Sequence, residues 1–282
     1  MTPPRLLTIA GSDSGGGAGI QADLKTFAAH GAYGMSVITA LTAQNTREVR
    51  AVHEVPPEMV AAQIDAVLED IGADAVKIGM LANAGIVRAV ASRLHFHLKG
   101  KKVPVVLDPV MIAKSGARLL RADAIEFLLL RLLPSTTLVT PNIPELEEMT
   151  RLPARSEKER LSAAQSLAAI GTAVLAKGGH AEGEEIVDLL VTGRFGKEVH
   201  RFTHPRLHTS STHGTGCTLS SAIAARLGAG EDLPRAVGGA IDYLSGALAA
   251  AYPLGSGDGH GPVNHLFELR PVSARAREDE TR

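Results

Sequence analysis

The clearest chemistry in the sequence lies in the run HGTGCT at residues 213–218. An apolar pattern at Leu219, Ile223 and Leu227 follows it, so the run is predicted to begin a helix. Its two glycines let backbone amides turn towards one point, and the helix dipole adds positive potential there. The pattern predicts an anion pocket without a charged side chain, which suits a phosphoryl group in transfer.

Cys217 lies in the first turn of this predicted helix and is the single cysteine of the 282-residue chain. A helix N-terminus lowers the pKa of a thiol, and the resulting thiolate could take a proton from an attacking hydroxyl group. A small buried apolar cysteine is the alternative. One cysteine excludes an intramolecular disulfide and a zinc site of clustered thiolates, and it fits a reducing cytoplasm.

A glycine-rich run, GSDSGGGAG at residues 11–19, follows the first apolar segment and precedes a predicted helix at residues 20–30. It satisfies a loose dinucleotide-binding fingerprint, in which helix-terminal amides bind phosphate. That fingerprint also needs an acid after the second strand, where this chain has Gln44 and Asn45, and no Gly-Lys-Ser/Thr completes a P-loop. The alternative is a tight turn that allows close helix packing.

Polar side chains at the ends of predicted strands form a second group. If the strands are parallel neighbours, Asp13, Asp23 and Gln44 would converge on one rim of the sheet, where open α/β sheets bind ligands. The amide of Gln44 donates and accepts side by side, which suits a ring nitrogen next to an exocyclic amine. Taken alone, a glutamine such as Gln44 is more often a solvated loop residue.

Apolar runs bounded by Gly, Pro or Asp predict the strands that position these residues. Helical patterns between several of the runs indicate βα units and a mostly parallel sheet. Residues 185–202 read better as a β-hairpin, so we expect a mixed sheet. Segments 215–227 and 233–251 are rich in Ala and Gly and are predicted to be helices packed closely on the sheet. The predicted core strands are residues 6–10, 36–43, 75–78, 103–107, 137–140 and 173–176.

Composition sets the broad class. The chain is 45% hydrophobic and 21% charged, which predicts one globular α/β domain over residues 1–270. A net charge of −1 supplies no general attraction to nucleic acid or to an acidic membrane. The apolar run at residues 6–10 is too short for a membrane span or a signal peptide. Residues 271–282 lack apolar periodicity, so we expect a disordered tail and a cytoplasmic protein without nucleic-acid or membrane partners.

Six motifs occur in order and together resemble one family. The pattern is similar to the hydroxymethylpyrimidine and hydroxymethylpyrimidine phosphate kinases of thiamine biosynthesis, and it extends to about residue 268. The resemblance implies a ribokinase-like three-layer α/β/α fold with a mostly parallel central sheet and a small β-hairpin or lid. It also implies ATP with Mg²⁺, two successive phosphorylations and a homodimer. The motifs are AGSDSGGGAGIQADLKTF at 10–27, TALTAQNT at 39–46, LDPVM at 107–111, TPNIPELE at 140–147, KGG at 177–179 and HGTGC at 213–217.

The resemblance also implies roles for single residues. For the residues matched to the metal site, helix capping or a turn is the alternative role, above all for Asn142, which precedes Pro144 in the chain. The matching positions are Gly11, Asp23, Gln44 and Met80 for the pyrimidine pocket; Gly214, Thr215 and Gly216 for the anion hole; Cys217 for the catalytic base; Lys177 for a phosphate-facing lysine; and Asp108, Asn142 and Glu145 for the metal and its water.

Two further features are a loop at residues 111–119 and a set of four histidines. Residues 111–119, MIAKSGARL, resemble the flexible cover of the family's active site, with a solvated loop as the alternative. His95, His97, His204 and His208 show no spacing typical of a metal site, so we expect them to be surface or structural residues.

Three other functions remain open. Pyridoxal kinase is the nearest, because its substrate carries the same hydroxymethyl group on a pyridine, although Gln44 favours a pyrimidine. A non-catalytic pyrimidine-binding regulator would have no need for Lys177, the anion hole and Cys217 together. A dehydrogenase is disfavoured by the missing acid for a ribose.

Overall fold

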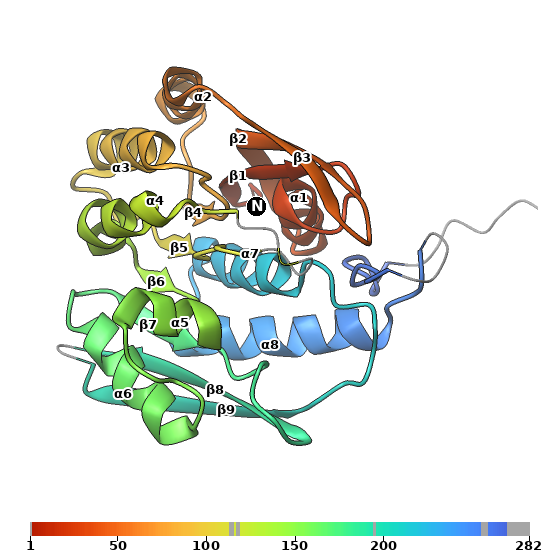
Figure 1. The fold of residues 1–282 in the computed structure, drawn as a ribbon. Coiled ribbons are helices and arrows are strands. Elements are labelled where there is room, and N and C mark those ends of the chain that lie inside the picture. Colours follow the sequence, from red (N-terminus) through yellow and green to blue (C-terminus); the bar gives the residue numbers. More distant parts are fainter. Residues whose placement is uncertain (1, 113–115, 117–118, 194–195, 255–258, 270–282) are drawn as a thin grey trace, which may run out of the picture.

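The computed structural model describes residues 2–112, 116, 119–193, 196–254 and 259–269. Its strands are β1 Arg5–Asp13, β2 Tyr33–Gln44, β3 Val49–Glu54, β4 Ala75–Ile78, β5 Val105–Leu107, β6 Leu138–Val139, β7 Ala173–Ala176, β8 Glu185–Thr192 and β9 Glu198–Pro205. They form one sheet in the order β3-β2-β1-β4-β5-β6-β7-β8-β9 (Figure 1). The six central strands, β2-β1-β4-β5-β6-β7, are parallel to one another. The other three, β3, β8 and β9, each pair antiparallel with the strand before them in the chain.

Helices cover both faces of this sheet (Figure 1). The buried core divides accordingly into one cluster that includes residues of α1, α7 and α8, and a second that includes residues of α2 to α6. In β1, Leu6 belongs to the first cluster and Leu7 to the second, because successive side chains of a strand point to opposite faces. The helices are α1 Gly19–Ala29, α2 Pro57–Asp70, α3 Ala84–Leu98, α4 Ala122–Phe127, α5 Ile143–Thr150, α6 Glu157–Ala168, α7 Thr215–Gly228 and α8 Leu233–Ala249, with a π-helical turn at Leu128–Leu132 and a 3₁₀ turn at Leu133–Ser135.

The predicted fold class is confirmed. All six predicted core strands are present, and residues 75–78 and 173–176 agree with β4 and β7 at both ends. The predicted hairpin forms β8 and β9 and extends one edge of the sheet. Sequence patterning missed β3, because nearly all of its side chains are exposed and no buried face gives it an apolar alternation.

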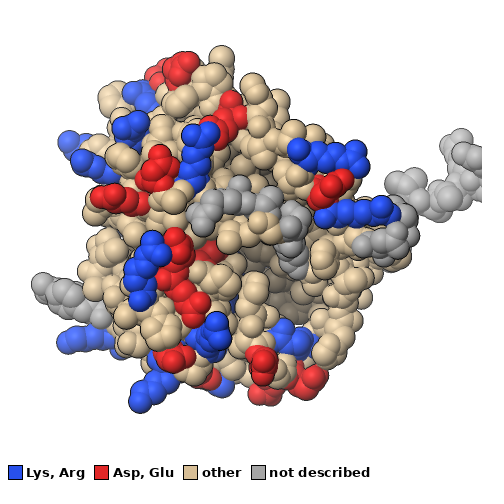
Figure 2. Space-filling view, in the orientation of Figure 1, with Lys and Arg blue, Asp and Glu red and all other residues tan. Residues whose placement is uncertain are grey.

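The single sheet shared by all the named strands supports our proposal of one domain over residues 1–270. The predicted tail at 271–282 and residues 113–115 and 117–118 of the predicted cover loop lie outside the described residues. Acidic and basic side chains are interspersed on the face shown in Figure 2. Within the part of the chain that the structure describes, no helix is both long and apolar enough to cross a membrane.

Candidate active site

A cavity of about 1090 Å³ lies at the carboxyl ends of the parallel strands. Residues at or just after the ends of β1, β2, β4, β5, β6 and β7 form its wall, together with the first turn of α7. This is the edge at which open α/β sheets bind ligands. Every residue predicted for the site lines the cavity except Asp23. The predicted residues that line it are Gly11, Gln44, Met80, Asp108, Asn142, Glu145, Lys177, Gly214, Thr215, Gly216 and Cys217.

The anion hole is formed by the start of α7. Gly214 is the N-cap, has a φ of 81° and offers no side chain to cap the amides of the first turn. A Cβ at Gly214 would lie 1.8 Å from the carbonyl oxygen of Gly17, so only glycine fits there. A Cβ at Gly216 would lie 3.2 Å from Asp108 Oδ2 and 3.5 Å from Lys177 Nζ. The predicted anion hole therefore lies directly against Asp108 and Lys177, which form an ion pair.

Asp108, Lys177 and Glu145 form a charged group at this end of the cavity. Lys177 Nζ lies 2.9 Å from Asp108 Oδ1, which also accepts a hydrogen bond from Thr140 Oγ1 at 3.2 Å. Burial raises the pKa of Glu145 to about 7, a trend that Lys177 opposes and Asp108 reinforces. Asp108 thus pairs with Lys177, and a cation bound nearby would favour the ionised form of Glu145.

Asn142 is the N-cap of α5, so the capping alternative describes its side chain. Its Oδ1 accepts from the backbone N–H of Glu145 at 2.9 Å, and Glu145 Oε2 accepts from the backbone N–H of Asn142 at 2.9 Å. This reciprocal capping box fixes the start of the helix. The structure shows Asn142 positioning Glu145, and its metal-holding role stays a prediction.

Cys217 lies at the cavity wall, as predicted, but its pKa moves in the opposite direction from the one expected. Burial raises the pKa of the thiol to about 11, which outweighs the lowering effect of the Lys77 charge. Asp23 and Asp108 raise the pKa of Cys217 further. The thiolate is therefore the minor form at neutral pH.

Asp23 is the predicted pocket residue that the structure places elsewhere. Its side chain is fully buried, and both of its oxygens lie within 2.9 Å of Lys77 Nζ. Thr8 donates to Oδ2 at 2.6 Å and Ser221 to Oδ1 at 2.7 Å. These partners surround the carboxylate, and Asp23 is not among the residues that line the cavity. Its role in pyrimidine binding stays a prediction, and the structure shows its contact with Lys77.

Lys77 is a functional candidate that sequence reasoning missed. It lies in the middle of β4, and its side chain is fully buried at the floor of the cavity. Burial lowers its pKa, but the charge and hydrogen bond of Asp23 and the charges of Cys217 and Asp108 together outweigh burial, so the net pKa is raised. Lys77 is therefore a permanent cation near Cys217. A lysine inside the apolar run AVKI was the available signal, because such a residue needs a buried partner.

His213 is a second residue that was missed. Its Nε2 lies 2.8 Å from Asp13 Oδ2 and 3.4 Å from Gln44 Nε2. Asp13 precedes His213 by 200 positions, so no local pattern reveals the pair. His213 thereby connects the predicted ring-reading residue with the loop that leads into the anion hole.

The glycine-rich run at residues 11–19 forms a tight turn, which was the alternative to phosphate binding. Asp13 Oδ1 accepts from the amide of Gly15 at 2.8 Å, and Oδ2 accepts from the amides of Gly17 and Ala18 at 3.1 and 2.9 Å. These amides are thus satisfied by the protein's own carboxylate rather than directed at a phosphate. The anion hole is the one on α7.

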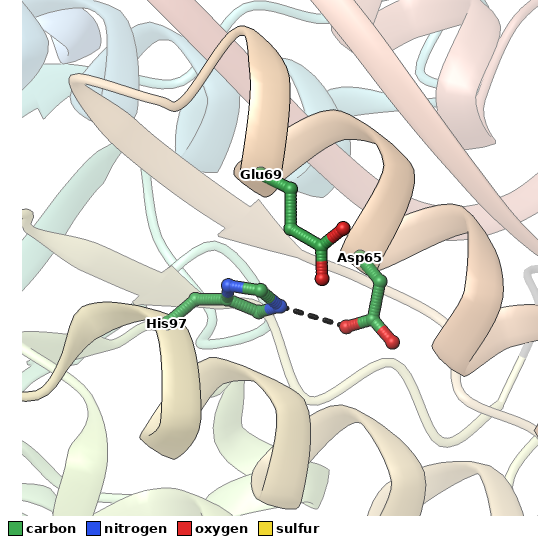
Figure 3. A group of neighbouring side chains, drawn as sticks. All are labelled: Asp65, Glu69 and His97. Atoms are coloured by element: carbon green, nitrogen blue, oxygen red, sulfur yellow. Dashed lines mark hydrogen bonds and ion pairs between the residues drawn. The ribbon is translucent and has the colours of Figure 1, made fainter.

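Three of the four histidines without metal spacing lie beside carboxylates. His204 lies 3.1 Å from Asp188, and His208 lies 3.0 Å from Glu184. His97 of α3 lies 2.7 Å from Asp65 of α2, with Glu69 pointing towards the same spot (Figure 3).

Arg93 shares Asp65 Oδ1 with His97. This network joins α2 to α3.

The fold and this cavity define a ribokinase-like small-molecule kinase. The chain belongs to the phosphomethylpyrimidine kinase family, whose model matches residues 13–264. It is 53% identical over 262 residues to the hydroxymethylpyrimidine/phosphomethylpyrimidine kinase of Salmonella typhimurium, covering 92% of this chain and 96% of that protein. It is 49% identical to the thiamine biosynthesis bifunctional protein ThiED of Geobacter sulfurreducens, over 96% of this chain but only 54% of the length of that relative.

Solved structures of related kinases have the same fold. An ADP complex of Bacillus subtilis pyridoxal kinase superimposes with a TM-score of 0.85 at 32% identity, covering 95% of this chain and all of that one. The phosphomethylpyrimidine kinase of Clostridium difficile 630 superimposes with a TM-score of 0.74 at 44% identity, covering 86% of this chain and 98% of that one. The predicted family and fold are thus confirmed.

Proposed function

We propose that this chain phosphorylates the hydroxymethyl group of 4-amino-5-hydroxymethyl-2-methylpyrimidine with ATP and then phosphorylates the monophosphate, as a step in thiamine biosynthesis. One observation carries the proposal: the amide of Gln44 and the anion hole beside Cys217 line the same cavity. The first can read a ring nitrogen and its neighbouring amine, and the second can bind the phosphoryl group. The names of the relatives in the family agree with this reading.

The phosphates of ATP would lie against the start of α7. There the amides of Thr215, Gly216 and Cys217 meet the ammonium of Lys177, whose pKa burial lowers but whose carboxylate neighbours raise overall. Fixed donors of this kind stabilise the charge on the transferring group in a dry site. Removing one such donor typically slows turnover by about 10²- to 10³-fold.

The residues present fit Mg²⁺. The Asp108 carboxylate lies close enough to raise the pKa of Glu145, and Lys177 forms an ion pair with Asp108. Mg²⁺ is commonly held by one or two carboxylates plus substrate phosphates and water. When bound, the ion would neutralise and orient the phosphate oxygens.

The transfer itself balances as an in-line displacement. The substrate hydroxyl oxygen forms a bond to the γ-phosphorus while the bond to the leaving ADP oxygen breaks. The hydroxyl proton passes to the Cys217 thiolate, which becomes the thiol. Because the thiol pKa is raised to about 11, the reactive thiolate fraction increases with pH, so turnover is expected to rise above pH 7.

Product analysis tests this function and separates it from pyridoxal kinase, to which the solved relatives of lower identity belong. The protein is incubated with ATP, Mg²⁺ and either the pyrimidine alcohol or pyridoxal, and the products are followed by phosphorus NMR. We expect two ATP to be consumed per pyrimidine and a diphosphate to form. A reaction that stops at the monophosphate, with faster turnover of pyridoxal, would assign the chain to pyridoxal phosphorylation.

We also propose a cytoplasmic homodimer. Val52 of the edge strand β3 exposes an apolar side chain, at 42% of its surface. A second copy covering this edge would remove it from water and protect the unpaired strand. Sedimentation of wild type and Val52→Lys checks this, because a dimer through this edge becomes monomeric in the variant.

A further inference from the structure

A chain of hydrogen bonds surrounds the side-chain amide of Gln44. On one side, Gln44 Nε2 lies 3.4 Å from His213 Nε2, which lies 2.8 Å from Asp13 Oδ2. On the other side, Gln44 Oε1 lies 3.2 Å from Thr42 Oγ1, which is also 2.9 Å from the carbonyl oxygen of Ser12. Each member of this chain can donate only a fixed number of protons, so the directions of the bonds can be derived.

The direction of the bond between Asp13 and His213 is set by the glycine-rich turn. Both Asp13 oxygens already accept backbone N–H groups, from Gly15 on one side and from Gly17 and Ala18 on the other. Burial raises the pKa of Asp13, but its bonds to His213 and to these amides outweigh burial and lower it overall. The carboxylate is therefore an acceptor, and His213 Nε2 carries the proton and donates it.

This direction conflicts with Gln44 Nε2 facing His213. Two donors would then oppose each other, while the single hydroxyl proton of Thr42 would have to serve both Ser12 and Gln44. A half-turn of the amide removes the opposition of donors, since Oε1 then accepts a share of the single N–H that His213 donates mainly to Asp13. In the same orientation Nε2 donates to Thr42, whose hydroxyl proton is left for Ser12. The nitrogen and oxygen of an amide have the same shape, so their positions are assigned from their partners.

We propose that Asp13 and His213 lock the Gln44 amide with its oxygen towards His213, and that this lock restricts the site to 4-aminopyrimidine alcohols and rejects their 4-oxo counterparts. The proposal rests on the proposed function. A free glutamine amide can rotate to match either pattern of donor and acceptor on a pyrimidine edge. A locked one offers its N–H only to an unprotonated ring nitrogen and its oxygen only to an amine.

The same lock directs the reacting group. In the substrate the ring nitrogen, the carbon bearing the amine and the carbon bearing the hydroxymethyl group are consecutive ring members. With the amine at Gln44 Oε1, the hydroxymethyl group extends past that oxygen on the side of His213. Gly214 follows His213 directly and begins the anion hole that contains Cys217. The opposite amide orientation would direct the hydroxymethyl group towards Thr42, away from α7.

The test compares the 4-amino alcohol with its 4-oxo analogue, in which the amine is replaced by a carbonyl and the ring nitrogen carries a proton. In the locked site the analogue leaves two polar groups opposed, so we expect wild type to prefer the amine by about 100-fold or more in kcat/KM. His213→Phe keeps a planar ring but removes the donor. We expect it to reduce this preference by about 10-fold or more, chiefly by improved use of the analogue.

His213→Gln is the matched control, because its side-chain NH2 has two protons and can donate to both Asp13 and Gln44. We expect it to retain most of the wild-type preference. A purely structural role of His213 would lower kcat/KM for both alcohols and could not improve use of the analogue. The lock is overturned if His213→Phe keeps the wild-type preference or if wild type uses both alcohols equally. Failure of wild type to phosphorylate the 4-amino alcohol at all would instead disprove the proposed function.

Discussion

Two aspartate–lysine pairs flank the anion hole, and they differ in what surrounds them. In the pair of Asp23 and Lys77 both side chains are fully buried, and protein groups satisfy both carboxylate oxygens. In the pair of Asp108 and Lys177 one oxygen binds the lysine, and both residues line the cavity. The same two residue types therefore serve once as a closed support and once as an open ligand-binding group.

The difference between the two pairs predicts which pair contributes most to folding stability and which contributes most to turnover. A buried ion pair is costly to form, and removing one member leaves an unpaired charge in the core. An ion pair that faces a cavity can exchange partners with water, phosphate or a cation. We therefore expect changes in the first pair to affect folding most, and changes in the second to affect turnover most.

The largest expected effect follows from Lys77→Met. It leaves the Asp23 carboxylate buried without its cation, so the free energy of unfolding should fall by about 3–5 kcal/mol. Chemical denaturation measures the loss. The double variant Asp23→Asn with Lys77→Met removes both charges and should recover part of the stability. A loss below about 1 kcal/mol in the single variant would show that the pair is not a support.

Lys177→Met should have the reverse profile. Its ammonium lines the cavity and is proposed to face the phosphates of ATP, so we expect turnover to fall by about 10²- to 10³-fold. The remaining Asp108 carboxylate can be solvated from the cavity, so the free energy of unfolding should change less than in Lys77→Met. Steady-state kinetics and denaturation of the same samples check both expectations. Equal losses of stability in the two variants would contradict the contrast between the pairs.

How far the sequence predicted this arrangement depended on the range of the interactions. The core strands and the start of α7 could be found, because apolar runs and glycines are local signals. Lys77 and His213 could not, because their partners Asp23 and Asp13 lie 54 and 200 positions away. The family pattern carried Asp23 into the pocket by its position in a motif, but the direction of its side chain depends on how α1 packs on the sheet.

The thiol between the two pairs gives a third measurement. Cys217 is the single cysteine, so iodoacetamide modification reports on it alone. Burial raises its pKa to about 11 from a reference value of 9.0, so near pH 8 it should react about 100-fold more slowly than in the unfolded chain. Reactivity should keep rising with pH above 9. Half-maximal reactivity at or below pH 9 would show that Lys77 and the helix N-terminus outweigh burial.

The smallest effect is expected at a third ion pair, which lies far from the cavity lining and tests whether the contrast is specific to the site. Asp65 joins α2 to α3 by accepting from Arg93 and His97 (Figure 3). Its side chain is 27% exposed, so solvent can replace much of what Asp65→Asn removes, and we expect a loss of about 0.2–1 kcal/mol with unchanged turnover.

The effect of Asp65→Asn should also depend on pH. Burial opposes ionisation of Asp65, but His97 and Arg93 outweigh burial and hold its pKa below the usual value of 3.8. A carboxylate with a lowered pKa stabilises the fold above its unfolded pKa and loses that contribution as the pH falls through the folded value. Wild type and Asp65→Asn should therefore differ in stability at pH 7, and the difference should begin to shrink below about pH 4 and vanish below the lowered pKa of folded Asp65. A difference that persists in acid would mean that packing of the helices, rather than charge, carries the effect of Asp65.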